Sequence, residues 1–287
     1  MDKMLQCNIR PITPEVNFTL TEPIIEDEIR KAIFQVKPHK APGVNRKGLE
    51  FYRSEWNTIR TESTQIMNCM FTDDPLMAQQ VKGLVVCIPK NRHPECIGDF
   101  RPLTLLNADY KILARIIANR LKPILQDLVH PQQHRGSMGT SVFEAVATIR
   151  DASAHSETTH KPLCVIAIDF QSAFERVSHR YLERVLHARG FDDPFLRRIM
   201  GLYRNASSEV QVNGFSSNCL PINCAIRQGC PLNTLLYALC INPLLHKLKA
   251  ALSGVQIRRR SPGTAIIAYA DDVTILFTDP DEVQTLQ

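Results

Sequence analysis

The chain has 287 residues, 44% of them hydrophobic, which is enough to bury a sizeable core and suits one or two domains. Its 34 basic and 29 acidic residues leave a net charge of +5, an excess that is compatible with a polyanionic partner but too small to demand one. The cysteines and histidines show no metal-type spacing and no apolar stretch could span a bilayer, which argues against a zinc site or a membrane protein and favours an intracellular one.

Hydrophobic periodicity predicts the elements of the N-terminal half. Residues 1–23 lack a clear pattern and are expected to form a linker or a disordered start. The elements predicted next are a helix over residues 25–36, a strand over residues 83–89 and a long amphipathic helix over residues 113–128. Ser141 followed by Glu144 is a capping-box signature that predicts the start of a further helix. The polar residues 151–161 predict a surface loop.

The C-terminal half shows a similar alternation of elements. The predicted elements are a strand over residues 163–168, a helix from Phe174 to Gly190, strands over residues 208–226 with a turn at Asn213-Gly214, and a helix over residues 232–252 bent or broken at Pro243. Three arginines at 258–260 predict an exposed loop, with a phosphate contact as the alternative. Residues 264–277 are otherwise apolar and read as two short strands joined at Asp271-Asp272.

This acidic pair lies in an unusual place for charge. A carboxylate in apolar surroundings costs several kcal/mol unless it is paired or holds a metal, and no Lys or Arg lies between Ser261 and Gln287. A bound cation is one explanation of Asp271 and Asp272. A hairpin turn of common composition is the other, and this segment alone does not decide between them.

Asp169 follows the apolar strand predicted at residues 163–168. Taken alone, its position favours an N-cap of the helix predicted after it, because Asp is a preferred capping residue. A third carboxylate beside Asp271 and Asp272 would change this interpretation, because Mg²⁺ takes oxygen ligands from a few carboxylates and from substrate phosphates. Two such ions about 4 Å apart are used by enzymes of phosphoryl transfer. The three aspartates therefore predict a nucleotidyl-transfer site.

Four blocks in order give the chain a resemblance to a known family. They are Ile88-Pro89-Lys90 with residues 100–107 and 110–114, then residues 168–174 around Asp169, then Arg227-Gln228-Gly229-Cys230-Pro231-Leu232, and finally Tyr269-Ala270-Asp271-Asp272. Together they resemble the reverse transcriptase domain of non-LTR, LINE-like retrotransposons. The resemblance runs from about residue 24 to the end of the chain.

The resemblance implies an α+β fold of the right-handed polymerase type. It implies fingers with an N-terminal finger extension at residues 24–160 and a palm built on a ferredoxin-like antiparallel sheet at residues 161–287. The family continues into a thumb beyond the point that corresponds to the end of this sequence, so we expect the thumb to be absent and the sequence to be a fragment, truncated on the C-terminal side of the palm. We therefore also expect this chain alone to show little or no processive synthesis.

The resemblance also implies the site and its partners. Asp169, Asp271 and Asp272 would be the catalytic residues and would bind two Mg²⁺ or Mn²⁺ ions. The residues that would contact the nucleotide are Lys90, Arg101, Phe170, Phe174, Gln228 and Gly229, with the carbonyl of Phe170 as a further metal ligand. Within this set, the ring of Phe174 would exclude a ribose 2′-hydroxyl. The implied partners are an RNA template, a DNA primer and deoxynucleoside triphosphates.

Two segments depart from the family pattern, and two other functions remain open. Asn45-Arg46 stands where the family more often has Asp-Gly, and residues 133–140 lack the usual aromatic-Gly and Gly-Arg pairs, so that Arg135 would have to supply a template contact. An RNA-dependent RNA polymerase would share the metals, but typically has Gly-Asp-Asp and no bulky residue at the Phe174 position. A non-catalytic, nucleic-acid-binding relic is the other alternative.

Overall fold

The computed structural model describes residue 5 and residues 11–36, 38, 40–72, 76–134, 141–257 and 263–286. The chain forms two compact units that alternate along the sequence. Unit 1 consists of Met1–Pro11, Lys122–Ala173 and Thr234–Gln287, and unit 2 consists of Ile12–Leu121 and Phe174–Asn233. Among the described residues, no helix is long and apolar enough to cross a membrane. The predicted boundaries of fingers and palm stay a prediction.

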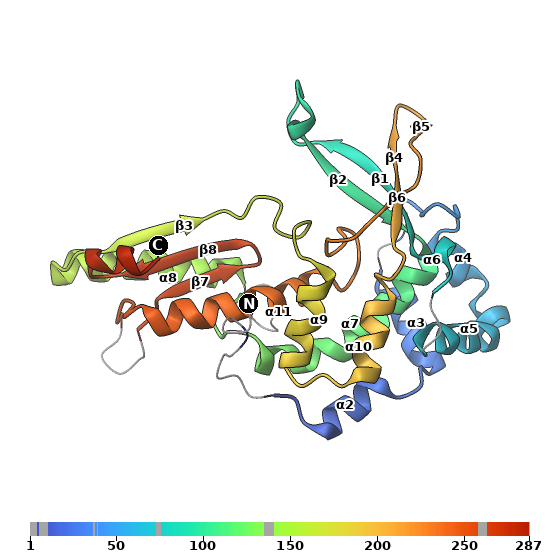
Figure 1. Cartoon of the computed structure of the whole chain (residues 1–287), viewed down its shortest axis with the longest axis horizontal. Coiled ribbons are helices and arrows are strands. Elements are labelled where there is room, and N and C mark those ends of the chain that lie inside the picture. The colour runs from blue at the N-terminus through green and yellow to red at the C-terminus, as the bar shows by residue number, and fades with distance from the viewer. Residues whose placement is uncertain are drawn as a thin grey trace. The chain divides into compact units, whose positions relative to one another are not determined.

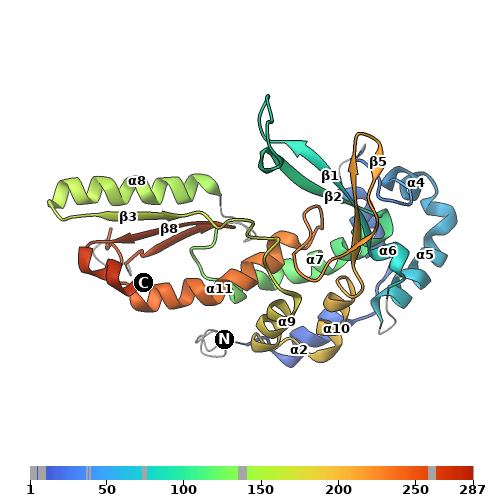
Figure 2. The ribbon, with the colours of Figure 1, turned by 45° about the horizontal axis from the view of Figure 1, so that its top comes forward.

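Unit 1 is built on a three-stranded antiparallel sheet of order β3-β8-β7 (Figure 1). Its strands are β3 (Cys164–Ile168), β7 (Ile266–Tyr269) and β8 (Asp272–Phe277). The other elements that contribute to unit 1 are the last part of α7 (Ala108–Leu128), α8 (Val142–Thr159), η2 (Pro280–Leu286) and α11 (Asn233–Ala251), with Pro243 inside the last. Helix α8 packs on one face of the sheet, where Ala152 joins Ile267 of β7 and Leu276 of β8 in a buried cluster (Figure 2).

Unit 2 contains a second sheet of order β2-β1-β4-β5, with β6 paired to β4. The strands are β1 (Lys82–Pro89), β2 (Phe100–Leu106), β4 (Ser207–Val212), β5 (Phe215–Ser216) and β6 (Leu220–Pro221). Strands β1 and β2 are antiparallel, whereas β1 and β4 are parallel. The predicted turn between β4 and β5 is confirmed, because Asn213 and Gly214 both have positive φ angles, of 50° and 84°.

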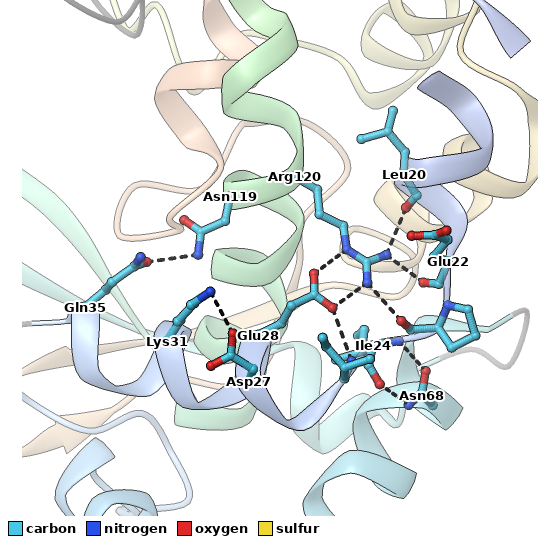
Figure 3. A network of polar contacts seen from close by, with 12 residues as sticks. Leu20, Glu22, Ile24, Asp27, Glu28, Lys31, Gln35, Asn68, Asn119 and Arg120 are labelled. Carbon is cyan, nitrogen blue, oxygen red and sulfur yellow. Dashed lines mark hydrogen bonds and ion pairs between the residues drawn. The ribbon is translucent and has the colours of Figure 1, made fainter. Parts of the chain in front are cut away.

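The helices of unit 2 lie around one end of this sheet (Figure 1). They are α2 (Pro14–Thr21), α3 (Glu26–Gln35), α4 (Leu49–Ser54), α5 (Trp56–Phe71), α6 (Ala78–Val81), α9 (His179–Ala188), α10 (Asp193–Gly201) and the first part of α7 (Ala108–Leu128). The short η1 (Ile97–Asp99) lies apart from them, in the connection between β1 and β2. Arg120 of α7 joins two of them: it donates to both carboxylate oxygens of Glu28 in α3, at 2.6 Å each, and to the carbonyls of Leu20, Glu22 and Pro23 (Figure 3).

The structure corrects three of the predicted elements. Residues 151–159 continue helix α8 instead of forming a loop, because Ala152 is fully buried and holds this part of the helix against the sheet. Part of the predicted disordered start is helix α2, which has Pro14 in its first turn. Helix α9 begins at His179, later than predicted, and the Ser178 side chain caps it by accepting from the Tyr181 N–H.

Some predictions fall outside the described residues, among them the template contact of Arg135 and the loop at 258–260. The helix start at Val142 is confirmed, but the Ser141 side chain makes no capping hydrogen bond.

Candidate active site

Asp169 and Asp272 lie at one end of the unit 1 sheet, on neighbouring strands. The last register pair of β3 and β8 is Ile168 with Val273, and Asp169 and Asp272 are the next residues beyond that pair, so continuing the same register would set them opposite one another. Because side chains alternate along a strand, both aspartates fall on the same face of the sheet when the alternation is carried one residue past Ile168. Phe170 follows at once and is half-buried.

Asp271 lies in the turn that joins β7 to β8. Tyr269 and Asp272 are the last paired residues, so the turn contains only Ala270 and Asp271. Ala270 has a φ of 58°, which is uncommon for a residue with a β-carbon. Asp271 also acts on Tyr237 of α11, whose pKa is raised first by burial and then by the negative charge of Asp271.

The carboxylates are more accessible than the apolar sequence around them suggested. Asp169 and Asp272 are exposed and Asp271 is half-buried, so burial alone does not force a cation on them. The expectation of charge in apolar surroundings is therefore wrong for Asp272, because its side chain lies at the open end of the strand. The N-cap interpretation of Asp169 is also wrong, because turns separate it from the first helix that follows, which Ser178 caps.

The carboxylate oxygens of Asp169, Asp271 and Asp272 are donor atoms that suit a hard divalent cation. Three carboxylates at one end of a sheet offer oxygen ligands only, and Mg²⁺ in proteins is commonly held by one or two carboxylates together with water and substrate phosphates. In the part of the chain that the structure describes, no three His, Cys, Asp or Glu side chains are already gathered as a metal-holding group. The oxygen donors of the three aspartates are of the type that Mg²⁺ prefers, but they do not form a closed metal site among the described residues.

The predicted nucleotide-contacting residues Gln228 and Gly229 lie in a tightly held loop of unit 2. Gly229 has a φ of 97°, and a β-carbon on it would lie 2.6 Å from the carbonyl oxygen of Thr104 in β2. Only glycine fits both conditions. The backbone at this position therefore lies close against strand β2.

Phe174 belongs to the same region of unit 2. Its carbonyl accepts a hydrogen bond from the Ile226 N–H at 2.8 Å, and its ring is half-buried. The Gln228 amide donates to the carboxylate of Glu175, the residue after Phe174. The structure thus brings Phe174, Gln228 and Gly229 together within unit 2, while Asp169, Phe170, Asp271 and Asp272 belong to unit 1.

Lys90 and Arg101 lie towards the free end of the β1–β2 hairpin. Arg101 is exposed and pairs in register with Ile88. Lys90 is exposed as well, but its ammonium group donates to the Gly98 carbonyl at 2.8 Å, which ties it to the loop of the hairpin. Exposed cations on a hairpin are available to a phosphate, and the guanidinium of Arg101 is suited to bidentate contact.

Two further residues hold these segments, and the sequence did not single them out for a role. The guanidinium of Arg227 is buried and donates to the carbonyls of Val81, the last residue of α6, and Ser207, the first residue of β4, so it fixes the loop before Gln228. Gln133 is fully buried and contacts the turn at Ala270. A buried charge in a motif could have indicated Arg227, but no local signal indicates Gln133, because its contact is 137 residues away.

Comparison with known proteins agrees with this geometry. The family described as "Reverse transcriptase (RNA-dependent DNA polymerase)" matches residues 88–287. The chain is 31% identical over 268 residues to the Transposon TX1 uncharacterized 149 kDa protein of Xenopus laevis, covering 93% of this chain and 20% of that protein. It is 29% identical over 195 residues to the Retrovirus-related Pol polyprotein from type-2 retrotransposable element R2DM of Drosophila melanogaster, covering 68% of this chain and 18% of that one.

A solved structure shows the same kind of fold. The apo telomerase from Candida tropicalis truncated from its C-terminal domain matches with a TM-score of 0.52 and 11% sequence identity, covering 78% of this chain and 51% of that one. The chain described here belongs to the reverse transcriptase family, with a mixed helix-and-sheet fold of that type. The predicted relation to non-LTR retrotransposons is confirmed, since its relatives include polyproteins of the elements R2 and R1. The chain spans about a fifth to a quarter of the length of the first of these curated relatives.

Proposed function

We propose that this chain catalyses RNA-directed DNA synthesis, transferring a deoxynucleotide from its triphosphate to the 3′-hydroxyl of a DNA primer on an RNA template. The observation that carries the proposal is the position of Asp169 and Asp272 at adjacent strand ends, with Asp271 in the two-residue turn beside them. Three carboxylates placed at one end of a sheet, in a member of the reverse transcriptase family, support a site for divalent metal and triphosphate.

In this proposal Asp169 and Asp271 hold both metal ions, Asp272 completes the acidic site, and the Phe170 carbonyl adds a ligand. Two Mg²⁺ or Mn²⁺ ions, when bound, would favour ionisation of the primer hydroxyl and neutralise charge on the leaving pyrophosphate. The role of the protein is to orient the triphosphate for in-line attack, since no nucleophilic side chain is needed.

The residues of unit 2 take the nucleotide-binding roles. Gln228 contacts the nucleotide, and Gly229 permits close approach of the backbone. Phe174 packs under the sugar and rejects a 2′-hydroxyl, while Lys90 and Arg101 bind the triphosphate. The β1–β2 hairpin is then part of the fingers at residues 24–160, and the sheet β3-β8-β7 is the ferredoxin-like sheet of the palm at residues 161–287. No described residue is assigned to a thumb.

The test is addition of a single deoxynucleotide by the purified chain to a DNA primer annealed to an RNA template, with Mg²⁺ or Mn²⁺. Asp271→Asn should abolish addition. Asp279→Asn is the matched control, because Asp279 is an exposed carboxylate beyond the opposite end of β8 and should leave addition unchanged. Retained addition by the Asp271 variant would overturn the assignment of the site.

The same assay separates the two alternatives. A non-catalytic relic would bind the primer–template without adding a nucleotide under any metal condition. An RNA polymerase would add ribonucleotides in preference to deoxynucleotides. The half-buried ring of Phe174 favours deoxynucleotide use over the second alternative.

A further inference from the structure

The turn that carries Asp271 is held by a residue from a distant part of unit 1. The side-chain Oε1 of Gln133 accepts a hydrogen bond from the Ala270 N–H at 3.0 Å. The Nε2 of the same side chain donates to the Ala270 carbonyl at 3.3 Å. One amide group therefore satisfies both backbone polar groups of a single residue, and it does so away from water, because Gln133 is fully buried.

The clamped residue is the one whose conformation needs support. Ala270 adopts a φ of 58°, and residues with a β-carbon keep such backbone angles only where their surroundings impose them. Ala270 is also buried, with 3% of its surface exposed, so water cannot replace its two hydrogen bonds with Gln133. The left-handed turn and the amide clamp are therefore parts of one arrangement.

Gln133 is itself fixed against strand β7. The Gln132 carbonyl accepts from the Ala268 N–H at 2.9 Å, and the His134 N–H donates to the Ala268 carbonyl at 2.8 Å. These bonds form a parallel bridge between Gln133 and Ala268, which extends the unit 1 sheet by one residue beside β7. The clamp is thus anchored to the strand that leads into the turn.

We propose that Gln133 is a positioning residue that holds the Ala270-Asp271 turn in the conformation needed to present the Asp271 carboxylate to a divalent metal. The direction of Asp271 follows from the backbone of the residue before it. Loss of the two hydrogen bonds between Gln133 and Ala270 lets the turn adopt other conformations, in which the Asp271 carboxylate points away from Asp169 and Asp272. This inference rests on the proposed function, because it takes Asp271 to be a metal ligand.

The structure supplies a matched control for the experiment. Asn68 of unit 2 makes an equivalent clamp: it accepts from the Ile24 N–H and donates to the Ile24 carbonyl, both at 2.8 Å (Figure 3). Ile24 has an ordinary negative φ and neither residue belongs to unit 1. Asn68→Leu therefore removes the same kind of interaction as Gln133→Met, without touching the turn.

Two measurements on the full chain test the inference. Hydrogen exchange followed by mass spectrometry reports the amides of residues 268–272, and the free-ion signal in electron paramagnetic resonance reports Mn²⁺ affinity. Gln133→Met should speed exchange in the turn and weaken Mn²⁺ binding about 10-fold or more, as loss of a residue supporting metal ligands does. Asn68→Leu should speed exchange around Ile24 and leave Mn²⁺ affinity within about twofold of the unaltered chain.

Asp271→Asn separates failure of this inference from failure of the proposed function. If Asp271→Asn weakens Mn²⁺ binding and Gln133→Met does not, the metal site stands and the positioning role of Gln133 is overturned. If turn exchange is unchanged in Gln133→Met, or if Asn68→Leu weakens Mn²⁺ binding equally, the positioning role is also overturned. If Asp271→Asn has no effect, the proposed metal site is wrong, and the role of Gln133 towards it falls with it.

Discussion

Gly229 lies so close to Thr104 that a β-carbon on it would stand 2.6 Å from the Thr104 carbonyl oxygen, which is backbone and cannot turn aside. Gly214 offers a comparison, since its φ of 84° is also positive but nothing lies within 4 Å of the corresponding position. Gly214→Ala should therefore cost only the conformational strain, about 1 kcal/mol. Gly229→Ala adds a clash with β2, and we expect a loss of about 2–3 kcal/mol in the free energy of unfolding.

Urea denaturation of both variants measures the difference. The same preparation of Gly229→Ala should also show reduced nucleotide addition, because the loop carrying Gln228 must move away from Thr104. Equal destabilisation by the two substitutions would contradict the close approach seen here.

Phe174 provides a test of substrate choice. If its half-buried ring lies under the incoming sugar, Phe174→Ala should raise ribonucleotide incorporation relative to deoxynucleotide incorporation by about 10-fold or more, with a modest fall in deoxynucleotide use. The measurement is the ratio of kcat/KM for the two nucleotides in single-nucleotide addition. Phe215→Ala, at an 82% exposed position on β5, should leave the ratio unchanged. If the ratio of the two kcat/KM values is unchanged in the Phe174 variant, the ring only packs against its neighbours and does not select the sugar.

Asp272 gives a prediction about metal and stability together. Like charges opposite one another on neighbouring strands repel, so Asp272→Asn should leave thermal stability in a chelator equal or slightly raised, by about 0.5 kcal/mol at most. Mg²⁺ that binds only the folded chain raises the melting temperature, and the variant should lose most of that rise. Melting curves with and without Mg²⁺ check both statements, with Asp279→Asn as a control that keeps the full rise. A full rise in the Asp272 variant would exclude it from the metal site.

The acidic hairpin was predictable from sequence because its pattern is local. Residues 264–277 are apolar apart from the acidic pair at their centre, and residues 163–168 form an apolar run that ends at Asp169, so the positions of the three aspartates at strand ends or in the turn followed directly. Their exposure did not follow, because it depends on where the neighbouring strands stop.

Contacts between distant segments could not be predicted in the same way. The clamp of Gln133 on Ala270 joins residues 137 apart, and neither residue type signals a partner. Likewise the length of α8 depends on Ala152, a small residue that stabilises a helix only where a sheet packs against it. The late start of α9 depends on Ser178, because the helical spacing of apolar residues begins before the residue that can cap the helix.

We expect the hydrogen bonds of Arg120 to contribute most to holding α7 against helices α2 and α3 of unit 2. Its guanidinium is little exposed and contacts Glu28 and three backbone carbonyls, so Arg120→Met leaves several acceptors without a donor (Figure 3). We expect a loss of about 2–3 kcal/mol in the free energy of unfolding. Lys31→Ala removes the exposed pair with Asp27 and should cost about 0.5 kcal/mol or less. Denaturation curves of the two variants compare them, and similar losses would show that the Arg120 network adds nothing beyond a surface ion pair.

His130 predicts a pH dependence of stability in unit 1. Burial, and then the positive charges of His246 and Lys249, lower the pKa of His130 to about 4 from its usual value near 6.5. The folded chain therefore keeps His130 neutral between these two pH values, while the unfolded chain takes up a proton. Stability should fall as the pH drops from about 7 to about 4, and the part due to His130 should be about 2 kcal/mol between pH 7 and pH 5.

The comparison of His130→Asn with the unaltered chain isolates this contribution. In the unaltered chain the Gln132 N–H donates a hydrogen bond to the Nδ1 of His130 at 3.2 Å. An asparagine side chain can still accept this hydrogen bond, but it cannot take up a proton. His179 of unit 2 also has a pKa lowered by burial and contributes in the same direction, but it is present in both proteins and cancels in the difference. Urea denaturation at pH 7 and pH 5 should show a smaller loss of stability in the variant. If both proteins lose the same amount, His130 is protonated in the folded chain at pH 5, and the hydrogen bond from Gln132 to its ring nitrogen cannot persist there.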